Sequence, residues 1–156
     1  MTTGELYRLP RDGGTFRFRI AVADAIRTPE KKLPVHPYLM GYWLGNGNAT
    51  KPEITVQTRD IPSVLAHMHP HHKAETAWQN VGDSVVFRIP DLKPVLLKSF
   101  HNKVIPVEYL RASHYQRLEL LQGLMDSDGA ISDRKGQAVY TSTEKALAES
   151  VGELLW

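Results

Sequence analysis

A pattern of nine residues occurs twice in this chain of 156 residues, and it constrains the fold more than any other sequence feature. The two copies are residues 39–47 and 121–129, and both read Leu-x-Gly-x-x-x-small-Asx-Gly. Asn46 and Asp128 hold the same place in the two copies, 82 residues apart. Each copy is followed by a polar loop, a strand pattern and a helix pattern. Such internal repetition predicts two copies of one structural unit.

The small residues of the pattern predict close contact between two helices. Gly41 with Gly45, and Gly123 with Ser127, are four residues apart and lie on one helix face. Small side chains allow two helix backbones to approach closely. Packing along these faces brings the two helix ends, and with them residues 46 and 128, close together.

Asp128 is the residue of the pattern with the clearest chemical meaning. Its carboxylate stands at a helix C-terminus, where the helix dipole opposes a negative charge. A bound divalent cation would reverse that disadvantage. The alternative is that both Asx-Gly pairs only terminate helices, which is their common use. The occurrence of two equivalent copies favours a paired site.

The remaining patterns indicate an α+β protein with a boundary near residue 35. Residues 1–34 are a lead-in with a strand at 15–20 and a Pro-bracketed linker at 27–34. Strands are expected at 53–59, 83–89 and 139–142. Helices are expected at 37–45, 60–68, 91–100, 107–112, 115–126 and from a Thr143 cap to the end.

Both repeat copies, with residues 102–113 and 116–129, resemble the LAGLIDADG (dodecapeptide, DOD-type) homing endonucleases of the intein-borne kind. The resemblance implies a saddle of tandem αββαββα units related by a pseudo-twofold axis. It implies hydrolysis of both strands of a long double-stranded DNA site with Mg²⁺ or Mn²⁺. Residues 2–20 are similar to the end of an intein splicing domain. The implied division is 1–34 lead-in, 35–114 first unit with connector, and 115–156 second unit.

Carrying the family motif over to this sequence gives Asp128 and Asn46 as the catalytic pair. The same resemblance implies that these two side chains, with the main-chain carbonyls of Gly45 and Ser127, hold the metal. Asn46 departs from the family pattern because an amide offers only a neutral oxygen. We therefore expect cleavage to be impaired or lost.

The length after the second motif is the other departure. After residue 128 only 28 residues follow, so we expect a truncated second unit, without its last two strands and final helix. An unpaired sheet edge and apolar face would then favour self-association. Self-splicing by this chain alone is not expected, because it has no cysteine and no carboxy-terminal His-Asn pair.

The alternating segment 53–59 suggests a DNA-binding face. Thr55, Gln57 and Arg59, joined by Arg88 from the next strand, have side chains suited to reading base edges in a major groove. Arg134 and Lys135, at a predicted hairpin tip, suit phosphates. Alternatively, these six side chains only form part of a solvated surface.

Composition narrows the class of protein and of site. The absence of cysteine excludes thiolate metal sites and disulfides, and the net charge of +2 permits a polyanionic partner. No apolar run reaches the roughly 18–20 residues of a membrane span, so we expect a soluble, cytoplasmic protein without a membrane partner. The histidines at 67, 69, 71 and 72 are a rival metal site, or a solvated loop.

Three functions remain open on the sequence. The first is an impaired homing endonuclease domain. The second is a catalytically dead DNA-binding remnant, and the third is a structural, splicing-associated fragment that binds no DNA. Salt-dependent binding of duplex DNA separates the third from the others, and magnesium-dependent nicking separates the first two.

Overall fold

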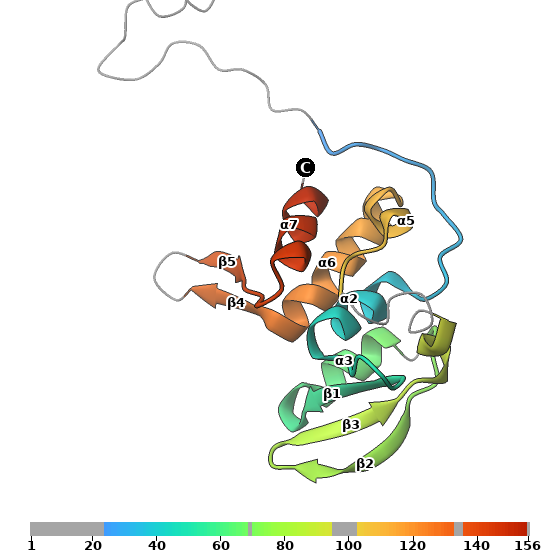
Figure 1. Cartoon of the computed structure of the whole chain (residues 1–156), viewed down its shortest axis with the longest axis vertical. Helices are drawn as coiled ribbons and strands as arrows, with labels where there is room; N and C mark the ends of the chain where they lie inside the picture. The colour runs from blue at the N-terminus through green and yellow to red at the C-terminus, as the bar shows by residue number, and fades with distance from the viewer. Residues whose placement is uncertain (1–23, 69, 95–102, 133–135, 156) are drawn as a thin grey trace, which may run out of the picture.

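The computed structural model describes residues 24–68, 70–94, 103–132 and 136–155, and it confirms a mixed α+β fold (Figure 1). Two helices cross in the middle, one small sheet lies below them, and a β-hairpin projects to one side. The helices are α2 (Pro37–Asn46), α3 (Ile61–Met68), α5 (Val107–Leu110), α6 (His114–Asp128) and α7 (Lys145–Leu154). The strands are β1 (Glu53–Gln57), β2 (Glu75–Val81), β3 (Ser84–Arg88), β4 (Gly129–Ser132) and β5 (Gln137–Tyr140), with 3-10 turns η1 (Thr58–Asp60) and η2 (Pro90–Leu92).

The packing of α2 against α6 is the most extensive contact between two elements. A Cβ on Gly41 would collide with the backbone carbonyl of Leu120, and a Cβ on Gly123 with that of Tyr38. The contacts are reciprocal, and they confirm the predicted close approach along the small-residue faces. Tyr42 is buried at this junction, with only 1% of its surface exposed.

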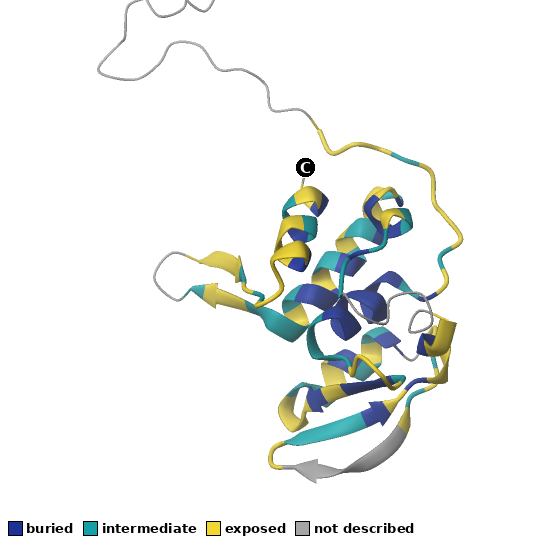
Figure 2. Ribbon diagram, in the orientation of Figure 1, coloured by how far each residue is buried: buried dark blue, intermediate teal, exposed yellow. Residues whose placement is uncertain are grey.

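The hydrophobic core surrounds these two helices and reaches the inner face of the larger sheet (Figure 2). Helix α2 is buried over almost its whole length because nearly all of its residues are apolar. Its largest fully buried side chains are Trp43, Tyr38, Tyr42, Leu39, Met40 and Leu44. Burial of Tyr42 and Trp43 agrees with a core role for the motif helix aromatics.

The larger sheet has the strand order β1-β3-β2, with both pairs antiparallel. Ile54 and Val56 on β1 are fully buried, while Thr55 between them and Gln57 after them are exposed. The alternation produces one face toward the core and one polar outer face.

The described chain just before α2 is held against the rest of the molecule. Residues 24–35, the strap, run along the α5–α6 corner. The side chain of Gln116 accepts from Lys31 N at 3.0 Å and donates to Lys31 O at 2.7 Å. Tyr109 OH binds both the N–H and the carbonyl of Val35, and it is itself buried. Buried polar partners distant in sequence therefore fix the strap.

Helix α6 starts with a capping box. Ser113 accepts from Gln116 N, and Gln116 accepts in return from Ser113 N. These two bonds satisfy free N–H groups of the first turn and fix where the helix begins.

Several predicted boundaries need correction. The strand expected at 53–59 ends at Gln57, because Thr58 to Asp60 form a 3-10 turn. The helix expected at 91–100 is preceded by the 3-10 turn Pro90–Leu92 and becomes helical at 93–94, and its remainder lies outside the described residues. Strand β2 was not predicted, since its sequence lacks a clean apolar alternation.

Two corrections concern the C-terminal part. The strand expected at 139–142 is β5, two residues earlier, and it pairs with β4, which follows α6 directly. Glu144 rather than Thr143 caps α7, and its N–H binds Ser142 Oγ. The strand expected at 15–20 lies outside the described residues. Within the described part, no helix is long and apolar enough to cross a bilayer.

Candidate functional site

The adjoining C-termini of α2 and α6 bring the two Asx residues of the repeat together. A Cβ on Gly45 would collide with the side chain of Ser127 and would lie 3.0 Å from Asp128 Oδ2. Asn46 Nδ2 donates a hydrogen bond to the Ser127 carbonyl at 3.4 Å. The four residues named from the family motif therefore form one cluster, hereafter called the centre.

Lys103 also belongs to the centre, although the sequence analysis gave it no role. Its Nζ donates to the carbonyl oxygens of Gly45 at 2.9 Å and Gly47 at 2.8 Å, and it lies 5.8 Å from the ring centroid of Trp43. The available signal was its place in the connector at residues 102–113, a segment that the resemblance already singled out.

In the centre, Asp128 and Lys103 each affect the pKa of the other. Burial raises the pKa of Asp128, and Lys103 opposes that shift. Burial lowers the pKa of Lys103, and Asp128 opposes that shift in turn. Burial also raises the pKa of Tyr140 to about 12, with a further contribution from Asp128. Each of the two charges therefore helps to keep the other ionised in a half-buried position.

Among its described residues, the centre offers a single carboxylate to a divalent cation. Asp128 supplies a carboxylate, the ligand that Mg²⁺ prefers. The carbonyl of Gly45 is already an acceptor for Lys103, and that of Ser127 for Asn46. Asn46 adds no negative charge, so a second dication would meet an amide and an ammonium.

The outer face of the larger sheet carries three of the predicted DNA-binding residues. Thr55 and Gln57 on β1 and Arg88 on β3 are exposed. The register pairs Glu53 with Arg88, which places all these side chains on the same face. Arg88 Nη2 lies 3.6 Å from the largely buried Glu53 carboxylate, and this contact orients the guanidinium.

The other predicted DNA-binding residues stand apart from this strand face. Arg59 lies in η1 beyond the end of β1 and is 3.6 Å from the neighbouring Asp60. Arg134 and Lys135 lie outside the described residues.

A second contact between the motif helices involves Asp126. Tyr38 OH on α2 donates to Asp126 Oδ2 on α6 at 2.9 Å. Burial, the hydrogen bond to Asp126 and its charge all raise the pKa of the Tyr38 phenol, so the donor stays protonated. Asp126 is exposed, and through Tyr38 it also connects the two helices.

The histidine cluster forms a separate group. His67 Nε2 lies 2.9 Å from Gln122 Nε2, and His72 Nδ1 lies 2.8 Å from Asp91 Oδ2. His36 stacks on His71 with 3.9 Å between ring centroids. No set of three or more His, Asp or Glu side chains within the described residues is arranged to hold a metal. His69 lies outside those residues.

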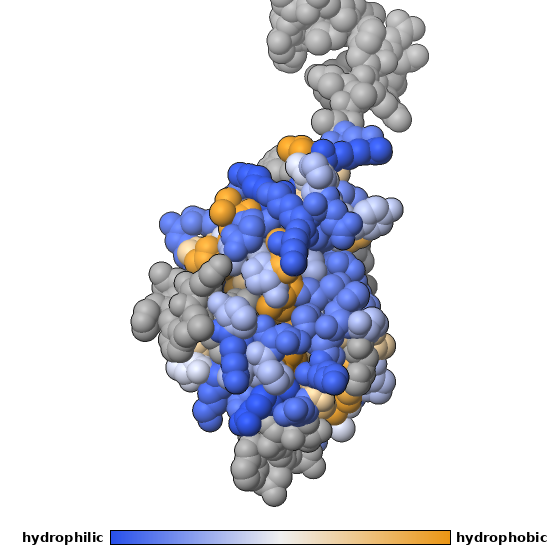
Figure 3. Space-filling model, turned by 90° about the vertical axis from the view of Figure 1, so that its right-hand side faces the viewer, coloured by the Kyte–Doolittle hydropathy of each residue, from blue (hydrophilic) through white to orange (hydrophobic). Residues whose placement is uncertain are grey.

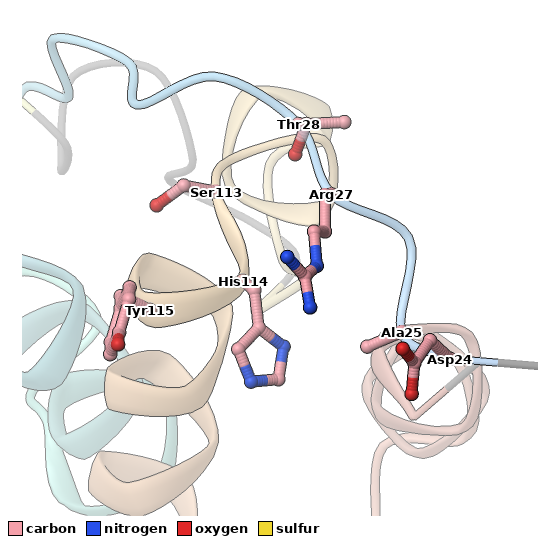
Figure 4. A pocket seen from close by; sticks show the side chains of 7 residues that line it. All are labelled: Asp24, Ala25, Arg27, Thr28, Ser113, His114 and Tyr115. Atoms are coloured by element: carbon pink, nitrogen blue, oxygen red, sulfur yellow. The ribbon is translucent and has the colours of Figure 1, made fainter.

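A cavity of about 550 Å³ lies between the strap and the start of α6 (Figure 4). Arg27 from the strap and His114 from the helix both project toward it, with Asp24 at its far side. Asp128 is at the opposite end of this 15-residue helix. A rise of about 1.5 Å per residue separates the two ends by roughly 20 Å, so this cavity is distinct from the centre.

The surface on the strap side of the molecule is mainly hydrophilic, with apolar residues in small separate groups (Figure 3). Scattered apolar residues are normal on a protein surface. This side therefore has the character of a face that meets solvent.

Comparison with known proteins adds two findings. Residues 116–156 match the family model described as a LAGLIDADG-like domain. The replicative DNA helicase DnaB of Mycobacterium intracellulare is 30% identical over 157 residues, which include 99% of this chain and 25% of the relative. The chain thus spans about a quarter of the length of the curated relative that it matches.

Proposed function

The chain carries a LAGLIDADG homing-endonuclease-like domain, and from this premise we propose that it is the DNA-binding domain of an intein-associated homing endonuclease with impaired cleavage. The observation that carries the proposal is the meeting of Asp128 and Asn46 at two adjoining helix ends. Family members place two acidic residues at such a junction. Here one of the two is an amide.

The residues of the centre have different roles in this proposal. Asp128 would hold a divalent cation; its half-buried position raises the pKa of the carboxyl group, and Lys103 lowers it. A divalent cation, when bound, supplies Lewis-acid chemistry at a phosphodiester. The Lys103 ammonium provides a fixed positive charge beside a DNA phosphate. Asn46 positions the Ser127 carbonyl but adds no charge.

The outer sheet face supplies the DNA contact. Gln57 can pair with adenine edges, Arg88 with guanine edges, and Thr55 with a thymine methyl group. All three are exposed on one face, and their register spaces them regularly along two strands. Arg59 at the strand end adds positive charge near the phosphates, as we propose for Arg134 and Lys135.

The intein association draws support from the match to DnaB. Replicative helicase activity is that of the relative, of which this chain covers 25%. An endonuclease-like segment within a helicase sequence is what an inserted intein would produce. We therefore propose that residues 1–34 belong to a splicing domain, that 35–114 and 115–156 are two LAGLIDADG units, and that the protein acts in the cytoplasm. Sequencing the coding DNA on both sides tests this part directly. A reading frame without splicing-domain segments would exclude the intein.

Cleavage and binding are tested separately. Duplexes selected from a random library by the wild-type chain serve as substrates, and nicking is followed in Mg²⁺ or Mn²⁺. We expect binding with little or no nicking, and more nicking after Asn46→Asp in the full-length protein. Unchanged nicking in a correctly folded Asn46→Asp protein would show that the amide is not the cause of impairment.

A DNA-binding remnant without cleavage is the second candidate. The observation that favours it is the ammonium and amide in place of a second carboxylate. Complete absence of nicking in both wild type and Asn46→Asp, with binding intact, would select this candidate.

A further inference from the structure

We propose that the buried carboxylate of Glu53 holds the Arg88 guanidinium for the edge of a guanine base and keeps it from binding a DNA phosphate. Glu53 is then a positioning residue, and Arg88 is the residue that contacts the base. The inference rests on the proposed function, because it concerns the same outer face of the larger sheet. It adds that this face requires guanine at one position of the bound duplex.

Arg88 is the middle member of a row of three charged residues across one end of the sheet. It is the last residue of β3, the central strand. The register places Glu53 of β1 opposite it on one side and Glu75 of β2 opposite it on the other. Directly opposite residues of antiparallel strands have their side chains on the same face. The arginine therefore has an acidic neighbour on each side.

Glu53 is the one charged residue that is buried in the described part of the chain, with 8% of its surface exposed. A carboxylate is rarely buried without a partner. Its partner is Arg88, whose side chain is 51% exposed and whose Nη2 lies 3.6 Å from Glu53 Oε1. The Glu53 backbone is fixed as well, since its N–H donates to the Lys51 carbonyl at 2.7 Å and its carbonyl accepts from Asn48 N at 2.8 Å. The negative charge is thus fixed, while the guanidinium stays accessible.

The guanidinium keeps its hydrogen-bond donors available for DNA. A separation of 3.6 Å is too long for a hydrogen bond, so the contact with Glu53 is an ion pair only. No described residue accepts a hydrogen bond from the Arg88 side chain. Its planar fork of N–H groups can therefore donate to O6 and N7 of one guanine, the pairing that arginine makes in a major groove.

The charges of the row favour a base edge over a phosphate. The guanine edge is neutral, whereas a phosphate that approached Arg88 would be repelled by the carboxylates of Glu53 and Glu75. Glu53 also compensates the arginine charge before DNA arrives. A compensated arginine releases few counterions from DNA when it binds, so it should add little to the salt dependence of binding.

Arg59 gives a contrast on the same sheet. It also lies 3.6 Å from a carboxylate, that of Asp60, but the two side chains are 80% and 44% exposed. Exposed ion pairs are weak and are screened by salt. Arg59 is therefore free to exchange Asp60 for a phosphate, while the burial of Glu53 keeps Arg88 compensated.

The salt dependence of duplex binding distinguishes the two kinds of contact. The probe is a duplex selected from a random library by the wild-type full-length chain, and the slope of log affinity against log salt is measured. Each phosphate contact contributes about 0.9 to the steepness of that slope. We expect Glu53→Gln to steepen the slope by about that amount, because the released arginine reaches a phosphate. Glu53→Gln/Arg88→Met should restore the wild-type slope, because the added contact comes from Arg88.

Base preference is the second readout, measured with duplexes that differ only at the guanine position. The preference for guanine should be lost in Glu53→Gln/Arg88→Met, a change of about 5-fold to 100-fold in relative affinity, and reduced in Glu53→Gln. The double variant removes both partners of the ion pair, so it leaves no buried charge unpaired and keeps the test valid if Glu53→Gln alone does not fold.

Glu149→Gln supplies the matched control for net charge. Glu149 is exposed on α7, which lies across the motif helices from the larger sheet (Figure 1). This variant changes the net charge of the chain as Glu53→Gln does, and it should keep the wild-type slope and base preference. An equal steepening in both variants would assign the effect to net charge and overturn the inference.

Two further results would overturn the inference. One is an unchanged slope in folded Glu53→Gln, and the other is a slope in the double variant that is less steep than wild type by about one phosphate contact. Either result, with duplex binding by the wild type intact, removes the role of Glu53 alone. Absence of duplex binding by the wild type at every salt concentration removes the proposed function itself.

Discussion

His36 shows how neighbouring side chains change the chemistry of one residue. Its ring is partly buried, and the rings of His71, His72 and His67 lie close by. Burial, together with the charges of the three neighbouring imidazoles, lowers the pKa of His36 from 6.5 to about 4. Glu119, 3.4 Å from Nε2 and partly exposed, acts in the opposite direction but does not outweigh them.

This shift predicts loss of stability in acid. The unfolded chain protonates His36 below about pH 6.5, while the folded chain resists protonation down to about pH 4. The stabilisation is therefore complete above pH 6.5 and declines between pH 6.5 and 4. The free energy of unfolding should fall by on the order of 2 kcal/mol from this residue alone.

Urea unfolding of wild type and His36→Asn at pH 7 and pH 4.5 measures the effect. The difference in free energy of unfolding between the two pH values should be smaller in the variant. Identical differences in both proteins would show that His36 does not carry the pH dependence.

At the scale of elements, the contact of α2 with α6 holds the centre together. Gly41→Ala should lower the free energy of unfolding by about 1–3 kcal/mol, because its Cβ would collide with backbone atoms of Leu120 and Leu124. Chemical unfolding, followed by circular dichroism, measures the change.

Gly152 in α7 supplies the matched control. A Cβ there meets nothing within 4 Å, so Gly152→Ala should raise the free energy of unfolding by about 0.5–1 kcal/mol through helix propensity. The two substitutions are expected to change the free energy of unfolding in opposite directions. Comparing them therefore separates the effect of the collision from that of helix propensity. If Gly41→Ala is neutral or stabilising, the close approach of the helices is contradicted.

The elements that could be predicted are those with strong local signals. Helices α2 and α6 follow from the repeat, and the burial pattern of β1 follows from its alternating residues. Strand β2 escaped prediction because pairing with β3, rather than its own residue pattern, forms it. The strap escaped because its order comes from Gln116 and Tyr109, about 75–85 residues away.

The centre, like the secondary structure, could be predicted only where the sequence carries a strong local signal. The spacing of the repeat placed Asn46 and Asp128 together, since small residues one turn apart specify a close helix contact. Lys103 could not be placed by that route, because its position depends on how the connector returns to the end of α2. A lone lysine carries no periodic signal.

At the scale of the whole molecule, the projecting hairpin leaves apolar surface in solvent. Ile131 is 74% exposed and Val139 is 44% exposed, on a sheet of only two strands. Exposed strand edges with apolar neighbours favour pairing between molecules.

We therefore expect self-association through β4 and β5 that increases with concentration. Sedimentation velocity of wild type and Ile131→Lys over a range of concentrations measures it. The variant should stay monomeric at concentrations where wild type does not. A monomeric wild-type chain at the highest concentration would contradict the expectation.

Binding of duplex DNA tests the central claim most directly. Fluorescence anisotropy of duplexes selected from a random library should show an affinity that falls steeply with salt, as phosphate contacts require. Gln57→Ala and Arg88→Ala should each weaken binding to the selected sequence by about 5-fold to 100-fold, corresponding to roughly 1–3 kcal/mol. Failure to select any duplex, or binding unaffected by either substitution, would contradict a DNA-binding role for this sheet face.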